Sequence, residues 1–329
     1  MNEFVYKVNA TSGPAPVIRK LGALRRGVEQ TPIVWKNELL LVTSIGEDDR
    51  DNEQCICVLD PETGKMSKPF AEGYYFASAY VENDTLYVFA TGRHDDGAFT
   101  AHQSEDENEW HDPRGSNTVR MYKSRDLENW EYKDILHDSK KRFWTTSVCK
   151  GKDCYMMAVE ACAEDGFETE EIGVPFTAFF AKSKDLEEWE FLPDYYSYTP
   201  ARYNACPTLR YLESDSYYYM VCLESLPCTR YASYIYRTKD FENWEVGIHN
   251  PIMLWSDEDR KLYHSANMKA EDIELLQKVL NINCSDMDFY EFEGKTHIFY
   301  ANGDQMGNAF ICKAIYDGGL QSFLQAFFK

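Results

Sequence analysis

The sequence has 329 residues, and its 44% hydrophobic and 15% aromatic content excludes an intrinsically disordered chain. With 34 Lys and Arg against 55 Asp and Glu, the formal net charge is −21, which argues against binding to nucleic acid or to an anionic membrane surface. No apolar run approaches the ~18 residues that a membrane-spanning helix needs.

The amino-terminal residues and the cysteines bear on the cellular compartment. Residues 1–16 show no basic segment followed by an apolar one, so we expect no signal peptide. The ten cysteines fall mostly in apolar, strand-like runs, and their spacing matches no zinc-binding pattern. Buried free thiols in a reducing cytoplasm fit both observations, and a secreted form whose leader has been removed is the alternative.

Five segments in chain order have the pattern of a β-hairpin, with two apolar runs around a short polar turn. Turns such as Asn83-Asp84 and Glu293-Gly294 are typical of tight hairpins. The five segments are residues 32–44, 78–92, 146–160, 207–224 and 287–303.

A second repeated pattern follows three of these hairpins. Residues 124–130, 183–189 and 238–244 share Ser or Thr, then Asp two residues later, Leu or Phe next, and Trp at the end. The Ser or Thr and the Asp are suited to accept hydrogen bonds from nearby backbone N–H groups. We expect the Leu or Phe and the Trp to fold inward and close a tight turn.

Together these repeats predict an all-β fold, a five-bladed β-propeller with four antiparallel strands per blade, formed as a single domain by residues 1–329. A two-sheet sandwich is the alternative, but it needs no Trp-containing turn at the same place in each unit. Residues 270–281 break the pattern, because their apolar residues recur with a helical period. They predict a short helical insertion between blades four and five.

The Trp-containing turns and the five hairpins resemble the five-bladed glycoside hydrolases, namely the family 43 arabinanases and xylosidases and their relatives in families 32, 62, 117 and 130. The resemblance implies a carbohydrate substrate in the axial cavity. It also implies a base or nucleophile on an early blade, an acid on a middle blade and a further carboxylate that tunes them. Residues 28–32 replace the usual Asp-Pro of blade one, which leaves Glu29 as the nearest carboxylate, and blades two and four open without an acid.

The geometry of a propeller selects candidate carboxylates, because the start of the first strand and the end of the second strand of each blade meet at one mouth. Glycosidic cleavage needs one protonated carboxyl and one ionised carboxylate. Glu160 ends a strongly apolar strand, where burial raises the pKa of an acid, so we predict that it is the catalytic acid, with Glu224 as its rival. Glu29 or Asp286 is then the predicted catalytic base.

Further residues are candidates for substrate binding. The period of two in a strand places Asp286 and Asp288 on one side, where they could bind sugar hydroxyls or a divalent cation, or only cap the strand and its turn. Asp304 and Gln305 end the same hairpin. The remaining candidates, in or beside a long loop that could equally be solvated, are Arg93, His94 and His111.

The sequence therefore predicts a glycoside hydrolase that cleaves a terminal or short oligosaccharide without a required cofactor. One alternative is a glycoside phosphorylase, in which Arg93, Arg114, Arg202 and Arg210 would line the cavity for phosphate. The other is a non-catalytic propeller that binds carbohydrate or protein. Neither the sugar nor the oligomeric state is indicated.

Overall fold

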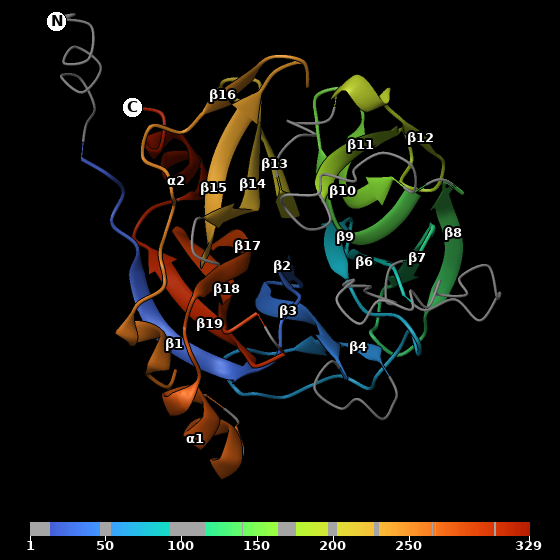
Figure 1. Cartoon of the computed structure of the whole chain (residues 1–329). Coiled ribbons are helices and arrows are strands. Elements are labelled where there is room, and N and C mark those ends of the chain that lie inside the picture. Colours follow the sequence, from blue (N-terminus) through green and yellow to red (C-terminus); the bar gives the residue numbers. More distant parts are fainter. Residues whose placement is uncertain are drawn as a thin grey trace, which may run out of the picture.

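The computed structural model describes residues 14–46, 54–92, 116–139, 141–163, 176–196, 203–226, 230–264, 266, 268–305 and 307–329. The described chain is mostly β-sheet, and its strands form successive antiparallel groups arranged around a common centre (Figure 1). Among the described residues no helix is long and apolar enough to cross a membrane.

The strands pair with their neighbours in sequence, and five antiparallel groups follow one another along the chain. The first group contains β2 (Gln30–Trp35), β3 (Glu38–Ile45) and β4 (Cys55–Leu59). The second contains β5 (Ser78–Glu82), β6 (Thr85–Ala90), β7 (Thr118–Ser124) and β8 (Glu131–His137). The third contains β9 (Lys141–Lys150), β10 (Tyr155–Ala163), β11 (Thr177–Ser183) and β12 (Trp189–Phe191).

The last two groups are joined into one eight-stranded sheet by a short parallel contact between β15 and β17. The fourth group contains β13 (Asn204–Leu212), β14 (Tyr217–Leu226), β15 (Arg230–Thr238) and β16 (Trp244–Val246). The fifth contains β17 (Asn283–Phe292), β18 (Lys295–Gly303), β19 (Ala309–Tyr316) and the amino-terminal strand β1 (Arg19–Arg26).

The first strands of the groups, called the inner strands below, contact one another in a closed order: β2, β5, β9, β13, β17 and again β2. In Figure 1 the labelled inner strands β2, β9, β13 and β17 lie around the middle of the molecule. The predicted all-β propeller class is confirmed. The number of five blades stays a prediction, which this closed order supports.

Apolar side chains form a separate cluster between each pair of neighbouring groups, and the alternation of side chains along a strand explains how one strand serves two clusters. On β10, Met157 and Val159 pack with residues of the second group. Met156 and Ala158 point the other way and pack with residues of the fourth group. The near-continuous apolar runs of the sequence therefore suit strands that are buried on both faces.

The three Trp-containing turns lie where the sequence predicts them, between the last two strands of the second, third and fourth groups. In the third group, Ser183 Oγ accepts a hydrogen bond from the Leu186 N–H at 2.9 Å, and Asp185 Oδ1 accepts from the N–H groups of Glu187 and Glu188, each at 2.9 Å. The hydrogen bonds from the Glu188 and Glu187 N–H groups lower the pKa of Asp185. Leu186 has φ 70°, and Leu127 and Phe241 take the same left-handed conformation in the other two turns.

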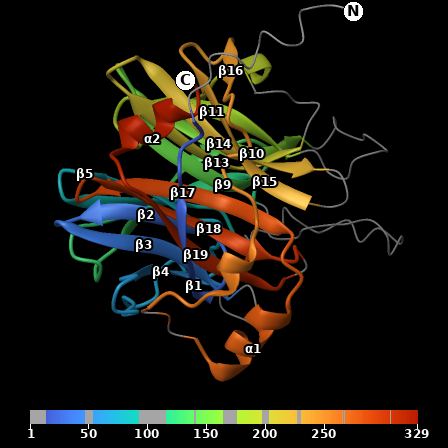
Figure 2. The same cartoon turned by 90° about the vertical axis from the view of Figure 1, so that its left-hand side faces the viewer.

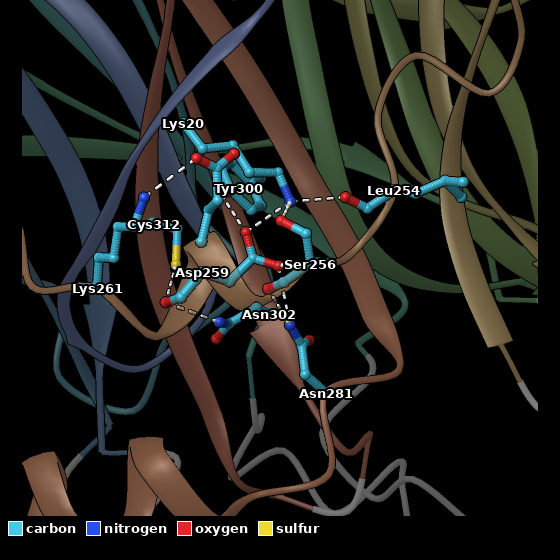
Figure 3. Close-up of polar contacts among 10 residues, drawn as sticks. Lys20, Leu254, Ser256, Asp259, Lys261, Asn281, Tyr300, Asn302 and Cys312 are labelled. Carbon is cyan, nitrogen blue, oxygen red and sulfur yellow. Dashed lines mark hydrogen bonds and ion pairs between the residues drawn. The ribbon is translucent and has the colours of Figure 1, made fainter.

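The amino-terminal strand β1 completes the fifth group by pairing with β19, a contact between opposite ends of the described chain (Figure 2). A buried polar cluster fixes this strand (Figure 3). Lys20 Nζ lies 2.6 Å from Asp259 Oδ1 in the 3-10 helix η3 (Asp257–Arg260) and also donates to the Leu254 carbonyl. Asp259 accepts further hydrogen bonds from Tyr300 Oη at 2.7 Å and Asn281 Nδ2 at 2.8 Å.

Helix α1 (Ala270–Lys278) occupies the predicted insertion between the fourth and fifth groups. Arg260 fastens it, because its guanidinium donates to the carbonyls of Leu276 and Val279 at the carboxyl end of the helix, each at 2.7 Å. A second helix, α2 (Leu320–Ala326), was not predicted and buries Phe323 and Leu324 against the fifth group. A further 3-10 helix, η2, spans Asp194–Tyr196.

Candidate active site

A pocket opens beside the five inner strands, in the first part of some and near the middle of others, and every inner strand or the residue just before it contributes to its wall. Residues from five separate segments of sequence therefore meet at one place. The lining residues are Glu29, Gln30, Thr31, Ala77, Thr145, Thr146, Cys206, Pro207, Thr208, Asp286 and Asp288.

Three of the lining residues have a left-handed backbone although none is glycine: Glu29 with φ 59°, Cys206 with φ 50° and Asp286 with φ 49°. Cys206 and Asp286 lie in irregular stretches of β13 and β17, where the register with the neighbouring strand shifts. Such conformations cost on the order of 1 kcal/mol or more and persist where the surrounding structure enforces them, most often at functional sites. The inner strands are therefore distorted at the pocket and regular elsewhere.

Glu160, the predicted acid, is buried near the end of β10 with 5% of its surface exposed. Its Oε2 accepts hydrogen bonds from the Thr145 hydroxyl and from the Cys206 N–H, the latter at 2.9 Å. Burial raises the pKa of Glu160 to about 7, and the negative charge of Asp286 acts in the same direction, whereas both hydrogen bonds oppose the rise. The carboxyl can therefore hold or release a proton near neutral pH.

The other two predicted catalytic carboxylates, Glu29 and Asp286, both line the pocket. Glu160 lies beside the same pocket, because its Oε2 is hydrogen-bonded to Thr145 and Cys206, which both line it. Burial raises the pKa of the Cys206 thiol well above its usual value, and the charges of Asp286, Glu160 and Glu29 raise it further. The thiol also makes a side-chain hydrogen bond with Asp286. The structure thus brings Glu29, Glu160 and Asp286 together around one cysteine, while their catalytic roles stay predictions.

Asp288 lines the pocket but is held by protein groups. Its Oδ1 accepts from the Arg210 guanidinium and from the Phe289 N–H, and Thr31 donates to the same carboxylate. Burial raises the pKa of Asp288 to about 6, and Arg210 opposes the rise. Arg210 in turn donates to the Phe289 carbonyl at 3.0 Å, so the pair is fixed from both sides.

Asp286 and Asp288 both line the pocket, which agrees with the prediction that they lie on one side of the strand. The strand is nevertheless irregular here, because the register shifts between Ser285 and Asp288 and Asp286 has a left-handed backbone. The pair also fits a divalent cation poorly, because Arg210 already occupies Asp288. In the described part of the chain, no three His, Cys, Asp or Glu side chains are arranged to hold a metal ion.

Several predicted substrate-binding residues are not among those that line the pocket. Glu224 is 1% exposed within β14, Asp304 accepts hydrogen bonds from the N–H and side chain of Asn308, and Gln305 is exposed in the turn after β18. Their roles stay predictions. Outside the described residues lie Arg93, His94, His111, Arg114 and Arg202.

Of the eleven lining residues only Glu29, Asp286 and Asp288 were predicted, and the unpredicted ones that bond to the carboxylate segments include Gln30, Thr145 and Cys206. Gln30 Nε2 donates to the Asp286 carbonyl at 2.6 Å and so supports the distorted stretch of β17. Cys206 acts on Glu160 through its backbone N–H, for which no side-chain pattern exists. The segment that contains Cys206, at the opening of blade four, has no acidic residue. The sequence therefore provided no reason to assign this segment a role in the site.

No protein-family model and no curated protein matches the sequence. Solved structures do match: one described as a glycoside hydrolase gives a TM-score of 0.59 at 14% identity, covering 92% of this chain and 92% of its own. A xylan β-1,4-xylosidase from Bacillus halodurans C-125 gives 0.56 at 12% identity, covering 91% of this chain and 54% of its own. A family 32 β-fructofuranosidase from Bombyx mori gives 0.54 at 13% identity, covering 91% and 61%.

These similarities establish that the chain has the fold of the propeller glycoside hydrolases. The resemblance to families 43 and 32 that the sequence indicates is confirmed at the level of fold, and no single family is assigned.

Proposed function

We propose that this protein is a glycosidase that hydrolyses a terminal or short oligosaccharide in the central pocket. The observation that carries the proposal is the position of Glu160: a buried carboxyl with a pKa of about 7 close to Glu29 and Asp286, which line the same pocket. Glycosidic cleavage needs this combination of one carboxyl that is protonated and another that is ionised near neutral pH.

In this proposal the protonated Glu160 donates its proton to the oxygen of the leaving group. Glu29 or Asp286, as a carboxylate, activates a water molecule or attacks the sugar carbon directly. The Thr145 hydroxyl and the Cys206 N–H then stabilise the carboxylate that Glu160 becomes, because both donate to its Oε2. The shared fold with a xylosidase and a fructofuranosidase supports a carbohydrate substrate.

The proposal is tested by the hydrolysis of a panel of aryl glycosides that differ in the leaving group. We expect Glu160→Gln to lower kcat for a 4-nitrophenyl or poorer leaving group by about 100-fold or more, because proton donation is lost. The same variant should keep most of its activity on the 2,4-dinitrophenyl glycoside, whose leaving group needs no proton. Glu29→Gln or Asp286→Asn should be inactive on both.

Controls separate the alternatives. Glu224→Gln changes a buried glutamate that does not line the pocket, and it should leave kcat within about threefold of wild type. If Glu224→Gln and not Glu160→Gln shows the leaving-group effect, the acid is Glu224. A rate that depends on added inorganic phosphate would instead establish a phosphorylase, and no turnover of the panel would leave a binding propeller.

A further inference from the structure

Cys206 contacts two of the three predicted catalytic carboxylates through two different groups. Its backbone N–H donates to Glu160 Oε2 at 2.9 Å, and its thiol makes a hydrogen bond with Asp286. The charged groups that face the thiol are Asp286, Glu160 and Glu29, and the neighbouring titratable side chain is Tyr203. In the part of the chain that the structure describes, none of the groups that chiefly set the pKa of this thiol is a cation.

The backbone at this point is held in a conformation that its sequence disfavours. Cys206 has φ 50°, and the residue that precedes a proline normally adopts an extended conformation. The register with β14 shifts between Ala205 and Thr208, so the distortion is confined to the part of β13 that lines the pocket. This distortion presents the N–H and the side chain of one residue to carboxylates that come from two different strands, β10 and β17.

A neutral thiol can only act on the adjacent Asp286 carboxylate as a hydrogen-bond donor, because Asp286 in its ionised form only accepts. Burial first, and then the surrounding negative charges, keep the thiol protonated by raising its pKa. A thiolate nucleophile is therefore disfavoured, and a donor that stabilises the ionised form of Asp286 is favoured.

We propose that Cys206 is a positioning residue of the active site, which fixes Glu160 through its N–H and holds Asp286 as a carboxylate through its thiol. The inference rests on the proposed glycosidase function, to which it adds a residue. It gives the distorted segment of β13 a role: this segment keeps the acid and a carboxylate partner at a fixed distance and in opposite protonation states.

The first test compares Cys206→Ser with Cys206→Ala. Serine keeps a hydrogen-bond donor, so kcat of Cys206→Ser should stay within about threefold of wild type. Alanine removes the donor, so Cys206→Ala should lower kcat about tenfold with KM little changed. A tenfold loss is the effect expected for one hydrogen bond to a charged group. The acidic limb of the pH–kcat profile should move to higher pH in Cys206→Ala only. Cys222→Ala, which removes a buried thiol that does not line the pocket, serves as the matched control.

The second test needs no substitution at Cys206 and no turnover. Alkylation by iodoacetamide, followed for each cysteine by peptide mass spectrometry, should be at least about tenfold faster at Cys206 in Asp286→Asn than in wild type, because the neighbouring charge is gone. The partly exposed Cys154 should react at the same rate in both proteins, and a general rise at Cys154 and Cys222 would reveal unfolding instead.

Two results would overturn the inference alone: a Cys206→Ala enzyme with the kcat and pH profile of wild type, or an unchanged Cys206 alkylation rate in folded Asp286→Asn. If wild type hydrolyses no glycoside, the proposed function falls and the catalytic role of Cys206 falls with it. A changed alkylation rate in that case would still show the contact between the thiol and Asp286.

Discussion

Burial chiefly raises the pKa of Glu160 to about 7, and among the described residues the main groups that set this pKa include no cation. Above this pH the folded protein must hold a buried negative charge, whereas the unfolded chain holds the same charge in water. The contribution of Glu160 to stability is therefore highest below a pH of about 4.5 and decreases as pH rises through about 7.

Replacing Glu160 by Gln removes this pH dependence. From pH 5 to pH 8, we expect the free energy of unfolding of wild type to fall by roughly 2 to 3 kcal/mol relative to Glu160→Gln. Urea unfolding of both proteins at the two pH values measures this difference. If the free energy of unfolding changes equally with pH in both proteins, the pKa of Glu160 is not raised by folding, and the residue is not protonated near neutral pH.

At the level of single residues, the type of a side chain and its place in the strand pattern allow acidic groups to be predicted near one site, and their catalytic roles stay predictions. Glu29, Glu160 and Asp286 are acidic side chains at strand starts and ends, and the structure brings them together. Cys206 and Gln30 act through a backbone N–H and through a contact with a backbone carbonyl, respectively. Such contacts depend on the distorted conformations of β13 and β17, which no residue pattern in the sequence indicates.

Strand β1 depends on the buried ion pair between Lys20 and Asp259, of which the lysine side chain is 6% exposed and the aspartate fully buried. We expect Lys20→Met to lower the free energy of unfolding by about 3 kcal/mol or more, because it leaves Asp259 as an uncompensated buried charge. The adjacent Arg19 forms an exposed pair with Asp317 at 3.9 Å, so Arg19→Met should cost less than about 0.5 kcal/mol.

Equilibrium denaturation of the two variants provides a matched comparison on the same strand. Equal and small effects would mean that the hydrogen bonds to Asp259 from Tyr300 and Asn281 suffice without the lysine. The buried cluster would then contribute little to holding β1.

The elements themselves were predictable where their signals are local. The patterns that predict the five hairpins and the three Trp-containing turns consist of residues close in sequence, and the apolar residues of α1 recur with a helical period. The pairing of β1 with β19 joins residues at opposite ends of the described chain, and α2 has only seven residues, too few for a periodic pattern. Both were therefore missed.

For the molecule as a whole, the negative charge extends into the pocket. No Lys, Arg or His is among the described residues that line it, and Arg210 compensates only Asp288. Glu29 and Asp286 would thus repel an anionic sugar, and no cation among the described lining residues offsets this repulsion. For the sugar that is hydrolysed, we expect kcat/KM of the corresponding uronide to be lower by at least about tenfold, and to recover partly as salt screens the repulsion.

Matched aryl glycosides, such as a galactoside with its galacturonide or a glucoside with its glucuronide, measure this preference. A uronide that is turned over as well as its neutral partner would indicate a cation in the part of the pocket wall that the structure does not describe. Such a result would also restore weight to a phosphorylase, which needs cations for its phosphate.

The closing contact between β1 and β19 has a consequence for biogenesis. On a ribosome β1 emerges roughly 300 residues before its partner β19, so its N–H and C=O groups on that side stay unpaired until β19 has been made. During that time the β19 edge of another newly made copy is an equivalent acceptor, and exchange of β1 between two molecules would produce a domain-swapped dimer with every native contact preserved.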